Sequence, residues 1–374
     1  MNALDRQRIG EALTLAHQAI GLSEPNPRVG CIIGFDDGRI LAQGHTRAAG
    51  QAHAEADALA QARAAGIDVR GATAWVTLEP CAHQGRTGPC SQALIAAGIQ
   101  RVVIGIRDPY HQVDGRGAQQ LRDAGIAVVY ADADQAAACR ELNIGFHSLC
   151  ERGRPWVRMK LAASLDGRTA LPDGSSQWIT GVHARTDGHA WRRRAGAVLS
   201  GIGTVLEDDP RLDVRLVPTS CQPLRVIVDS HLMTPVGARV LAPPGEVLIF
   251  AAAEEPQREQ ALRAAGAQIE HCPGPGGKVD LVAMIETLAR RDINELHIEA
   301  GHKLNASLLK AGLVDELLVY LAPTLLGEGR EMAALGSLAR LDDARRWSFT
   351  DLQRVGDDVR LMLRPLPEAM TPAS

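Results

Sequence analysis

The sequence predicts an α/β protein built from two domains, and three observations support this prediction. The chain has 374 residues, whereas a single hydrophobic core rarely grows past about 250–300 residues. Helical and strand-like apolar patterns alternate along the first half, as they do where helices cover a sheet. A short polar segment with Gly and Pro, residues 151–155, precedes a new apolar strand that opens at Trp156. We therefore expect domains at residues 1–151 and 152–374.

The elements of the first half follow from local patterns. Apolar residues at helical spacing, such as Ile9, Leu13 and Ala16, mark the first helix, and Asp37-Gly38 marks a hairpin between the first two strands. The next helix is rich in alanine, and a β-rich strand follows it. The predicted elements are a helix at 4–20, strands at 29–33 and 40–43, a helix at 52–64, a strand at 73–78, a helix at 91–97, strands at 101–106 and 127–130, and a closing helix and tail at 132–150.

Composition excludes several classes of protein. The net charge is −4 and no run of basic residues is longer than Arg192-Arg193-Arg194, which argues against a broad nucleic-acid or membrane surface. Seven scattered cysteines indicate a reducing compartment and not a disulfide framework. The N-terminus has mixed charges without the apolar stretch of a signal peptide, and no apolar run is long enough to span a membrane. We expect a cytoplasmic protein.

One imidazole, two thiols and a carboxylate form the most informative pattern. His53 and Glu55 stand two residues apart, and Cys81 follows Pro80, with Cys90 further on. Zinc takes four ligands, so three protein ligands leave one position for a water molecule that the metal acidifies. The signature of nucleobase deaminases is His-x-Glu followed by Pro-Cys-x-x-Cys, with the Glu as proton shuttle. Here eight residues separate the two cysteines instead of two.

Two other interpretations of this pattern stay open at this point. A structural zinc site needs a fourth ligand, and His83 is a candidate because it lies between the two cysteines. Cysteines can also be plain buried apolar residues without a metal. The context of His-x-Glu and Pro-Cys favours catalytic zinc on His53, Cys81 and Cys90, with Glu55 as the catalytic residue.

Three longer segments around these residues carry a family resemblance, with which the longer spacing agrees. The segments Asn26-Pro27-x-Val29-Gly30, His53-Ala54-Glu55 and Thr77-Leu78-Glu79-Pro80-Cys81-x-His83-x-Gly85-Arg86-Thr87-x-Pro89-Cys90 resemble the deaminase half of the bifunctional RibD family of riboflavin biosynthesis. The resemblance implies a cytidine-deaminase-like three-layer sandwich. It also suggests that Asn26 and His45 lie near the pyrimidine, although a turn residue and a loop histidine are the plain alternatives. The loop residues His83, Arg86 and Thr87 could meet the phosphate or the ring.

The second half resembles the reductase half of the same family, in the family's order. The resemblance rests on the strand from Trp156 into Ser164-Leu165-Asp166-Gly167, on 176–180, 198–215 and 223–230, and on Glu299-Ala300-Gly301. It implies a dihydrofolate-reductase-like α/β domain that uses NADPH. The implied cofactor-binding residues are Ala162, Thr169, Trp178, Thr204, Asp208, Ser230 and Gly301. The implied substrate-binding residues are Ser176, Arg192, Leu212, Arg215 and Glu299, of which the two arginines suit phosphate because their forks match its oxygens.

A Rossmann interpretation of Gly201-x-Gly203 fails at the third glycine, since Leu206 occupies that position. We interpret the turn as a close backbone approach to the cofactor, with a simple tight turn as the alternative. Lys303 is a candidate for a cofactor 2′-phosphate. Asp208, Glu299 and Lys160 remain open as proton donors in the reduction.

The sequence therefore predicts a multifunctional enzyme, a zinc hydrolase joined to an oxidoreductase. The resemblance implies deamination of 2,5-diamino-6-ribosylamino-4(3H)-pyrimidinone 5′-phosphate, and then reduction of the ribosyl group of the aminouracil product to ribityl. The partners we expect are these small molecules, without nucleic acid or membrane, and a homo-oligomer is the default assembly. One rival is a polynucleotide deaminase of the tRNA-editing type fused to an accessory domain, disfavoured by the missing basic aromatic groove. A second rival is a zinc-stabilised binding protein with dead sites.

Overall fold

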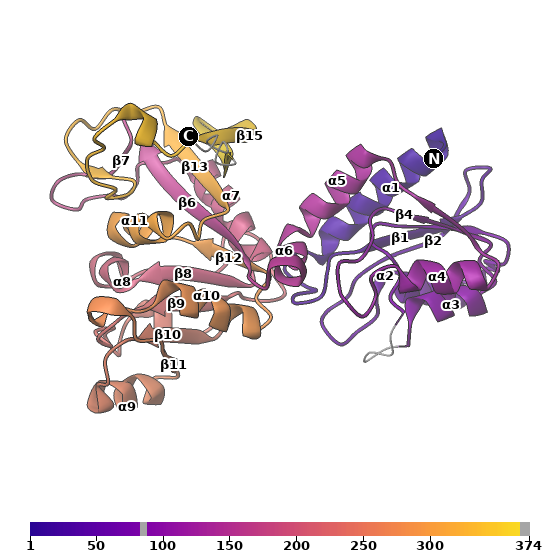
Figure 1. The fold of residues 1–374 in the computed structure, drawn as a ribbon, viewed down its shortest axis with the longest axis horizontal. Coiled ribbons are helices and arrows are strands. Elements are labelled where there is room, and N and C mark those ends of the chain that lie inside the picture. Colours follow the sequence, from indigo (N-terminus) through magenta and orange to yellow (C-terminus); the bar gives the residue numbers. More distant parts are fainter. Residues whose placement is uncertain (83–87, 367–374) are drawn as a thin grey trace, which may run out of the picture. The chain divides into compact units, whose positions relative to one another are not determined.

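The computed structural model describes residues 1–82 and 88–366, in two compact units, Met1–Arg154 and Pro155–Ser374 (Figure 1). Each unit has its own sheet and its own hydrophobic core. Among the described residues, no helix combines the length and the apolar character that crossing a membrane requires.

The first unit is a sheet with helices on both faces. In the described part of the chain the sheet has five strands in the order β2-β1-β3-β4-β5, with β1 antiparallel to β2 and β3, and the pairs β3–β4 and β4–β5 parallel. Its elements are α1 (Ala3–Ala16), β1 (Gly30–Gly34), β2 (Ile40–His45), α2 (Ala54–Ala64), β3 (Thr73–Val76), α3 (Cys90–Ala96), β4 (Arg101–Ile104), α4 (Arg116–Asp123), β5 (Ala127–Tyr130), α5 (Ala133–Leu142) and α6 (Ile144–Arg152).

Alternation along the strands sorts the side chains of this unit into two cores. Ile32, Trp75 and Val103 point to one face, where α1 and α5 cover them. Their neighbours Cys31, Ala74, Val76, Val102 and Ile104 point to the other face and pack against α2, α3 and α4. Successive residues of a strand face opposite sides, so strands buried on both faces lose the polar alternation of a half-exposed sheet. The predicted three-layer sandwich is confirmed (Figure 1).

Two predicted helices of this unit end differently from expectation. The first helix stops at Ala16, and a short 3-10 turn, His17–Ala19, continues it. The closing helix is two helices, α5 and α6, with a break at Asn143. The side-chain oxygen of Asn143 accepts a hydrogen bond from the backbone N–H of Arg28, and its side-chain amide donates to the backbone carbonyl of Arg28. The Asn143 side chain thus pairs with both backbone groups of a residue far away in the sequence, as a neighbouring strand does in a sheet. Periodicity could not reveal this long-range contact.

The second unit contains a mixed sheet in the order β11-β10-β9-β8-β12-β6-β13-β16-β15 among the described residues. The pairs from β11 through β13 are parallel, whereas β13–β16 and β16–β15 are antiparallel. The strands of this unit are β6 (Trp156–Ser164), β7 (Arg168–Ala170), β8 (Ala197–Gly201), β9 (Leu224–Val228), β10 (Val247–Ala251), β11 (Gln268–His271), β12 (Glu295–Ile298), β13 (Glu316–Ala322), β14 (Arg330–Glu331), β15 (Trp347–Val355) and β16 (Asp358–Pro365). Of these, β7 and β14 lie outside the mixed sheet and pair with each other in antiparallel orientation. Its helices are α7 (Val182–Arg194), α8 (Ile202–Asp208), α9 (Pro256–Ala264), α10 (Leu281–Arg290) and α11 (His302–Lys310).

The parallel part of this sheet places several loops at one edge. The strands β6, β8 and β12 are neighbours, so their carboxyl ends lie side by side. Open parallel sheets bind ligands in the crevice outside these ends. Residues 162, 201 and 299 come from or directly follow these three strands, and this edge is therefore where a site is expected.

Candidate functional site

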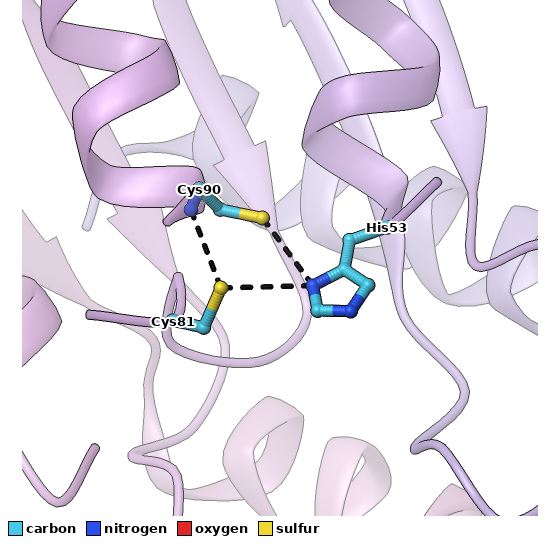
Figure 2. A group of neighbouring side chains, drawn as sticks. All are labelled: His53, Cys81 and Cys90. Carbon is cyan, nitrogen blue, oxygen red and sulfur yellow. Dashed lines mark hydrogen bonds between the residues drawn. The ribbon is translucent and has the colours of Figure 1, made fainter. Parts of the chain in front are cut away.

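The first unit brings the three predicted metal ligands together. His53 immediately precedes α2, Cys81 lies beyond the end of β3, and Cys90 is the first residue of α3. The Nδ1 atom of His53 lies 3.6 Å from the Cys81 Sγ atom and 3.5 Å from the Cys90 Sγ atom. Figure 2 shows this ring nitrogen facing both sulfur atoms. All three candidate ligand atoms lie within 4.8 Å of one another, and no second group of this kind occurs in the described part of the chain.

This arrangement fits a zinc ion. Zinc–sulfur bonds of about 2.3 Å and zinc–nitrogen bonds of about 2.0–2.1 Å, at a tetrahedral angle, separate nitrogen from sulfur by about 3.6 Å. Both observed nitrogen–sulfur distances agree with that value. Two thiolates and one imidazole also match the donor set of catalytic zinc, which keeps the fourth position for water. The ligand set proposed from the sequence is thus geometrically able to hold zinc.

Local structure favours a thiolate at Cys81. Hydrogen bonding from the Cys90 side chain lowers the pKa of Cys81 to about 4, with help from His53 and against the opposing effect of burial. The backbone N–H of Cys90, at the start of α3, also donates to the Cys81 sulfur over 3.3 Å. A helix N-terminus supplies free N–H groups and a positive dipole end, both of which stabilise an anion.

Glu55 lies in the first turn of α2, two residues past His53, and only 3% of it is exposed. Burial is the main cause that raises the pKa of Glu55 to about 7, and the charge of Cys81 adds to it. A carboxyl that can both take and give a proton near neutral pH suits general acid–base work. Glu55 is not one of the grouped ligand atoms, but its carboxyl interacts with the ligand Cys90.

The sequence analysis did not predict a role for Glu79, whose carboxylate fixes the segment next to the ligand cluster. Its carboxylate accepts backbone N–H groups of Asp108, Gly115 and Ala118 at 3.3, 3.1 and 3.0 Å. Gly115 precedes α4 and has no capping side chain of its own, so Glu79 takes over that role from across the fold. The signal was its place two residues before Cys81. Glu79 thereby ties the segment that carries Cys81 to α4.

The other predicted residues of this half have weaker support. His45 is buried at the end of β2, and its backbone N–H donates to the Asp57 carboxylate. Asn26 is half-buried, and its backbone N–H closes a turn onto Ser23. His83, Arg86 and Thr87 lie outside the described residues.

The second unit contains a cavity of about 590 Å³ at the predicted edge of the sheet, which is within the range of small-molecule sites. It is lined by most of the residues implied by the family resemblance: Ala162, Thr169, Ser176, Trp178, Arg192, Thr204, Asp208, Leu212, Arg215, Glu299 and Gly301. Lys160 lines it as well.

Two predicted cofactor contacts do not belong to this lining. Ser230 follows β9, and its hydroxyl oxygen accepts the N–H of Val279 at 3.2 Å. Lys303 is absent from the residues that line the cavity, although its neighbour His302 is present. The roles predicted for Ser230 and Lys303 therefore stay predictions.

The charges in the cavity are arranged in two groups. In the first group, the Arg192 guanidinium donates two hydrogen bonds of 2.5 and 2.8 Å to the Glu299 carboxylate, and both side chains are mostly buried. Burial alone would raise the pKa of Glu299, but the charge and hydrogen bonds of Arg192, with Lys160 nearby, hold it well below its ordinary value. In the second group, the buried Asp213 carboxylate pairs with both Arg211 and Arg215.

Comparisons with known proteins agree with both halves. Residues 3–106 match the cytidine and deoxycytidylate deaminase zinc-binding region, and residues 155–361 match the RibD C-terminal domain. The chain is 43% identical over 373 residues to the riboflavin biosynthesis protein RibD of Escherichia coli, covering 96% of this chain and 99% of that protein. It is 37% identical over 361 residues to the protein of the same name from Aquifex aeolicus, covering 96% of this chain and 98% of that one.

Solved structures show the same likeness over the whole length. RibD of Acinetobacter baumannii matches with a TM-score of 0.87 at 38% identity, covering 97% of this chain and 99% of that chain. The Thermotoga maritima diaminohydroxyphosphoribosylaminopyrimidine deaminase/5-amino-6-(5-phosphoribosylamino)uracil reductase matches with a TM-score of 0.85 at 31% identity, over 97% and 99% of the two chains. With both halves present in the same order, this chain belongs to the RibD family of bifunctional deaminase/reductases of riboflavin biosynthesis.

Proposed function

We propose that residues 1–151 remove the amino group of 2,5-diamino-6-ribosylamino-4(3H)-pyrimidinone 5′-phosphate. The observation that carries this step is the triangle of His53, Cys81 and Cys90 with the buried Glu55 beside it. Zinc held by these three ligands would supply an acidified water. The oxygen of that water would bond to the ring carbon that carries the amino group, and the bond from this carbon to the amino nitrogen would break. Glu55 would carry one proton from the water to the amino group, which leaves as ammonia, and the other water proton would end on the ring nitrogen.

We propose that residues 152–374 then reduce the ribosyl group of the aminouracil product with NADPH. NADPH supplies the hydride. The hydride forms a new C–H bond at C1′, the bond between C1′ and the ring oxygen breaks, and that oxygen takes up one proton. The cavity lined by Thr204, Gly301 and Glu299 lies at the carboxyl ends of parallel strands, where a dinucleotide and its substrate can meet.

Of the three proton donors left open by the sequence, Lys160 has the best support. Glu299 is held as a carboxylate by Arg192, so it has no proton to give at neutral pH. Asp208 is an exposed residue overall, but desolvation of its carboxyl at the cavity, followed by the charge of Glu207, raises its pKa, so it stays the second candidate. Lys160 lines the cavity, and burial lowers its pKa, an effect that Glu299 opposes. A lysine with a lowered pKa is a stronger acid than an ordinary one.

The pairing of Arg192 also changes its proposed role. Because Glu299 already compensates the charge of Arg192, we assign Arg192 to holding Glu299 in place. Arg215, whose side chain is 42% exposed, is the better candidate for the substrate phosphate. Trp178, Ser176 and Leu212 remain proposed contacts of the cofactor and substrate on the basis of their place in the lining.

The first experiment is a mass-spectrometric time course on the zinc-loaded protein with the diaminopyrimidinone ribosyl phosphate, with and without NADPH. We expect deaminated product without NADPH and ribityl product only with it. Lys160→Met, given the deaminated intermediate directly, should lose at least 100-fold in the rate of reduction while ammonia release stays normal. An unchanged rate in that variant would remove Lys160 from the mechanism.

The rival functions receive less support. A tRNA-type deaminase with an accessory domain does not explain why both halves match RibD proteins over nearly their full length. A zinc-stabilised binding protein with dead sites does not explain the complete set of ligands, Glu55 and the lined cavity. We further propose a cytoplasmic homo-oligomer, in keeping with seven free cysteines. Sedimentation velocity of the purified protein would test the assembly.

A further inference from the structure

His189 is a buried histidine of the reductase cavity that the proposed reaction does not yet use. It lies in α7, one turn before Arg192, and lines the cavity together with Arg192 and Arg215. Only 5% of the residue is exposed. A buried polar ring at the wall of a ligand site needs partners for both of its nitrogen atoms.

One ring nitrogen has a partner that fixes the tautomer. The backbone N–H of Arg215 donates to His189 Nδ1 over 3.2 Å. An N–H donor requires an acceptor, so in the neutral ring the hydrogen is on Nε2. Burial, followed by the charges of Arg192 and Arg215, lowers the pKa of His189 to about 4, and the ring is therefore neutral at physiological pH. Within the described residues, no protein acceptor takes the Nε2–H group.

The surroundings of His189 favour an anionic ligand. The charge of Arg192 is compensated by Glu299, but Arg211 and Arg215 share the single carboxylate of Asp213. The group formed by Arg211, Arg215 and Asp213 therefore carries one net positive charge, next to the neutral ring of His189. The Arg215 side chain is 42% exposed and keeps N–H groups beyond the one that binds Asp213. A phosphate offers several acceptor oxygens to such a group of donors.

We propose that the Nε2–H of His189 donates a hydrogen bond to a 5′-phosphate oxygen of the reductase substrate, beside Arg215. This inference rests on the proposed function of the second unit. His189 then has two tasks: its Nδ1 atom orders the backbone at Arg215, and its Nε2–H group contacts the ligand. The two tasks can be separated by substitution, because asparagine can replace only the Nδ1 acceptor and glutamine can replace only the Nε2–H donor.

The test measures reduction by His189→Asn and His189→Gln, with the aminouracil ribosyl phosphate and with the same compound lacking its 5′-phosphate. His183→Asn is the matched control, since His183 is an exposed histidine of the same helix. Binding of NADPH and the melting temperature are measured for every variant. These two readouts show whether the fold and the cofactor site are intact.

We expect His189→Asn to lower kcat/KM for the phosphorylated substrate by about 10- to 100-fold, mainly through KM, as for loss of a hydrogen bond to a charged group. With the dephosphorylated compound the loss should be less than about 3-fold. His189→Gln should recover part of the phosphate-dependent rate. Equal losses with both substrates, or no loss with either, would overturn the assignment. If the wild-type protein itself reduces neither compound, the proposed function fails first, and the inference fails with it.

Discussion

Replacement of Glu55 by glutamine is the sharpest test of the deaminase site. The amide keeps the shape of the side chain but cannot accept and return a proton. General acid–base groups contribute about 10²- to 10⁴-fold to a rate, equivalent to about 3–5 kcal/mol of barrier. Because only 3% of Glu55 is exposed, bulk water cannot easily take its place. We therefore expect Glu55→Gln to reduce ammonia release by about 10³-fold or more.

The assay follows ammonia release and measures zinc content by plasma mass spectrometry on the same sample. Glu55 is not among the grouped ligand atoms, so the variant should keep about one zinc per chain. Asp134→Asn removes an exposed carboxylate from the first turn of another helix and serves as the control. Reduction of the supplied intermediate should be unchanged. A zinc-loaded variant that keeps more than a tenth of the wild-type ammonia release would refute the proton-shuttle role.

Three further predictions concern stability and metal binding. Burial opposes ionisation of Asp5, but hydrogen bonds from Arg101 and other groups lower its pKa to about 2 in the folded protein. Asp5→Asn should therefore lower the free energy of unfolding in urea by about 2 kcal/mol at pH 7. Because the folded pKa is depressed, this difference between variant and wild type should persist above about pH 4 and vanish as the pH falls towards 2. Arg158 lies between the buried carboxylates of Glu295 and Glu316 at 2.8 and 2.6 Å. Arg194 and Arg364 would still pair with these carboxylates, so Arg158→Met should destabilise the second unit by about 3 kcal/mol, the lower end for a broken buried ion pair. Urea unfolding measures this loss, and the control variant Arg340→Met, at an exposed arginine, should change the free energy of unfolding little. Equal losses in the two variants would contradict this account. Cys81→Ser should lose zinc on dialysis and with it ammonia release, but retain reduction; full zinc occupancy would show that Cys81 is not a ligand.

Local patterns in the sequence predicted the α/β class of the first unit and the candidate metal ligands, whereas the fold of the second unit was predicted only from the family resemblance. Strand and helix periodicities predicted most elements of the first unit to within a few residues; no bounds were predicted for α4, and Asn143 interrupts the closing helix by pairing with Arg28. His53 and Cys90 each stand at the start of a helix, and Cys81 lies in the loop that follows a strand. Such positions can be recognised from the chain itself, so the ligand set and Glu55 could be named before any contact was known.

The charge partners of the reductase cavity were decided only by the tertiary structure. Arg192 and Glu299 are 107 residues apart, and they meet because α7 packs near the end of β12. That pairing is the reason why we propose that Arg192 holds Glu299 and that Glu299, kept as a carboxylate, is not the proton donor. The fixed tautomer of His189 depends likewise on a backbone N–H 26 residues away. Local periodicity describes how a segment folds, whereas ion pairs and hydrogen bonds between distant segments depend on the order of strands in the sheet, which no single segment encodes.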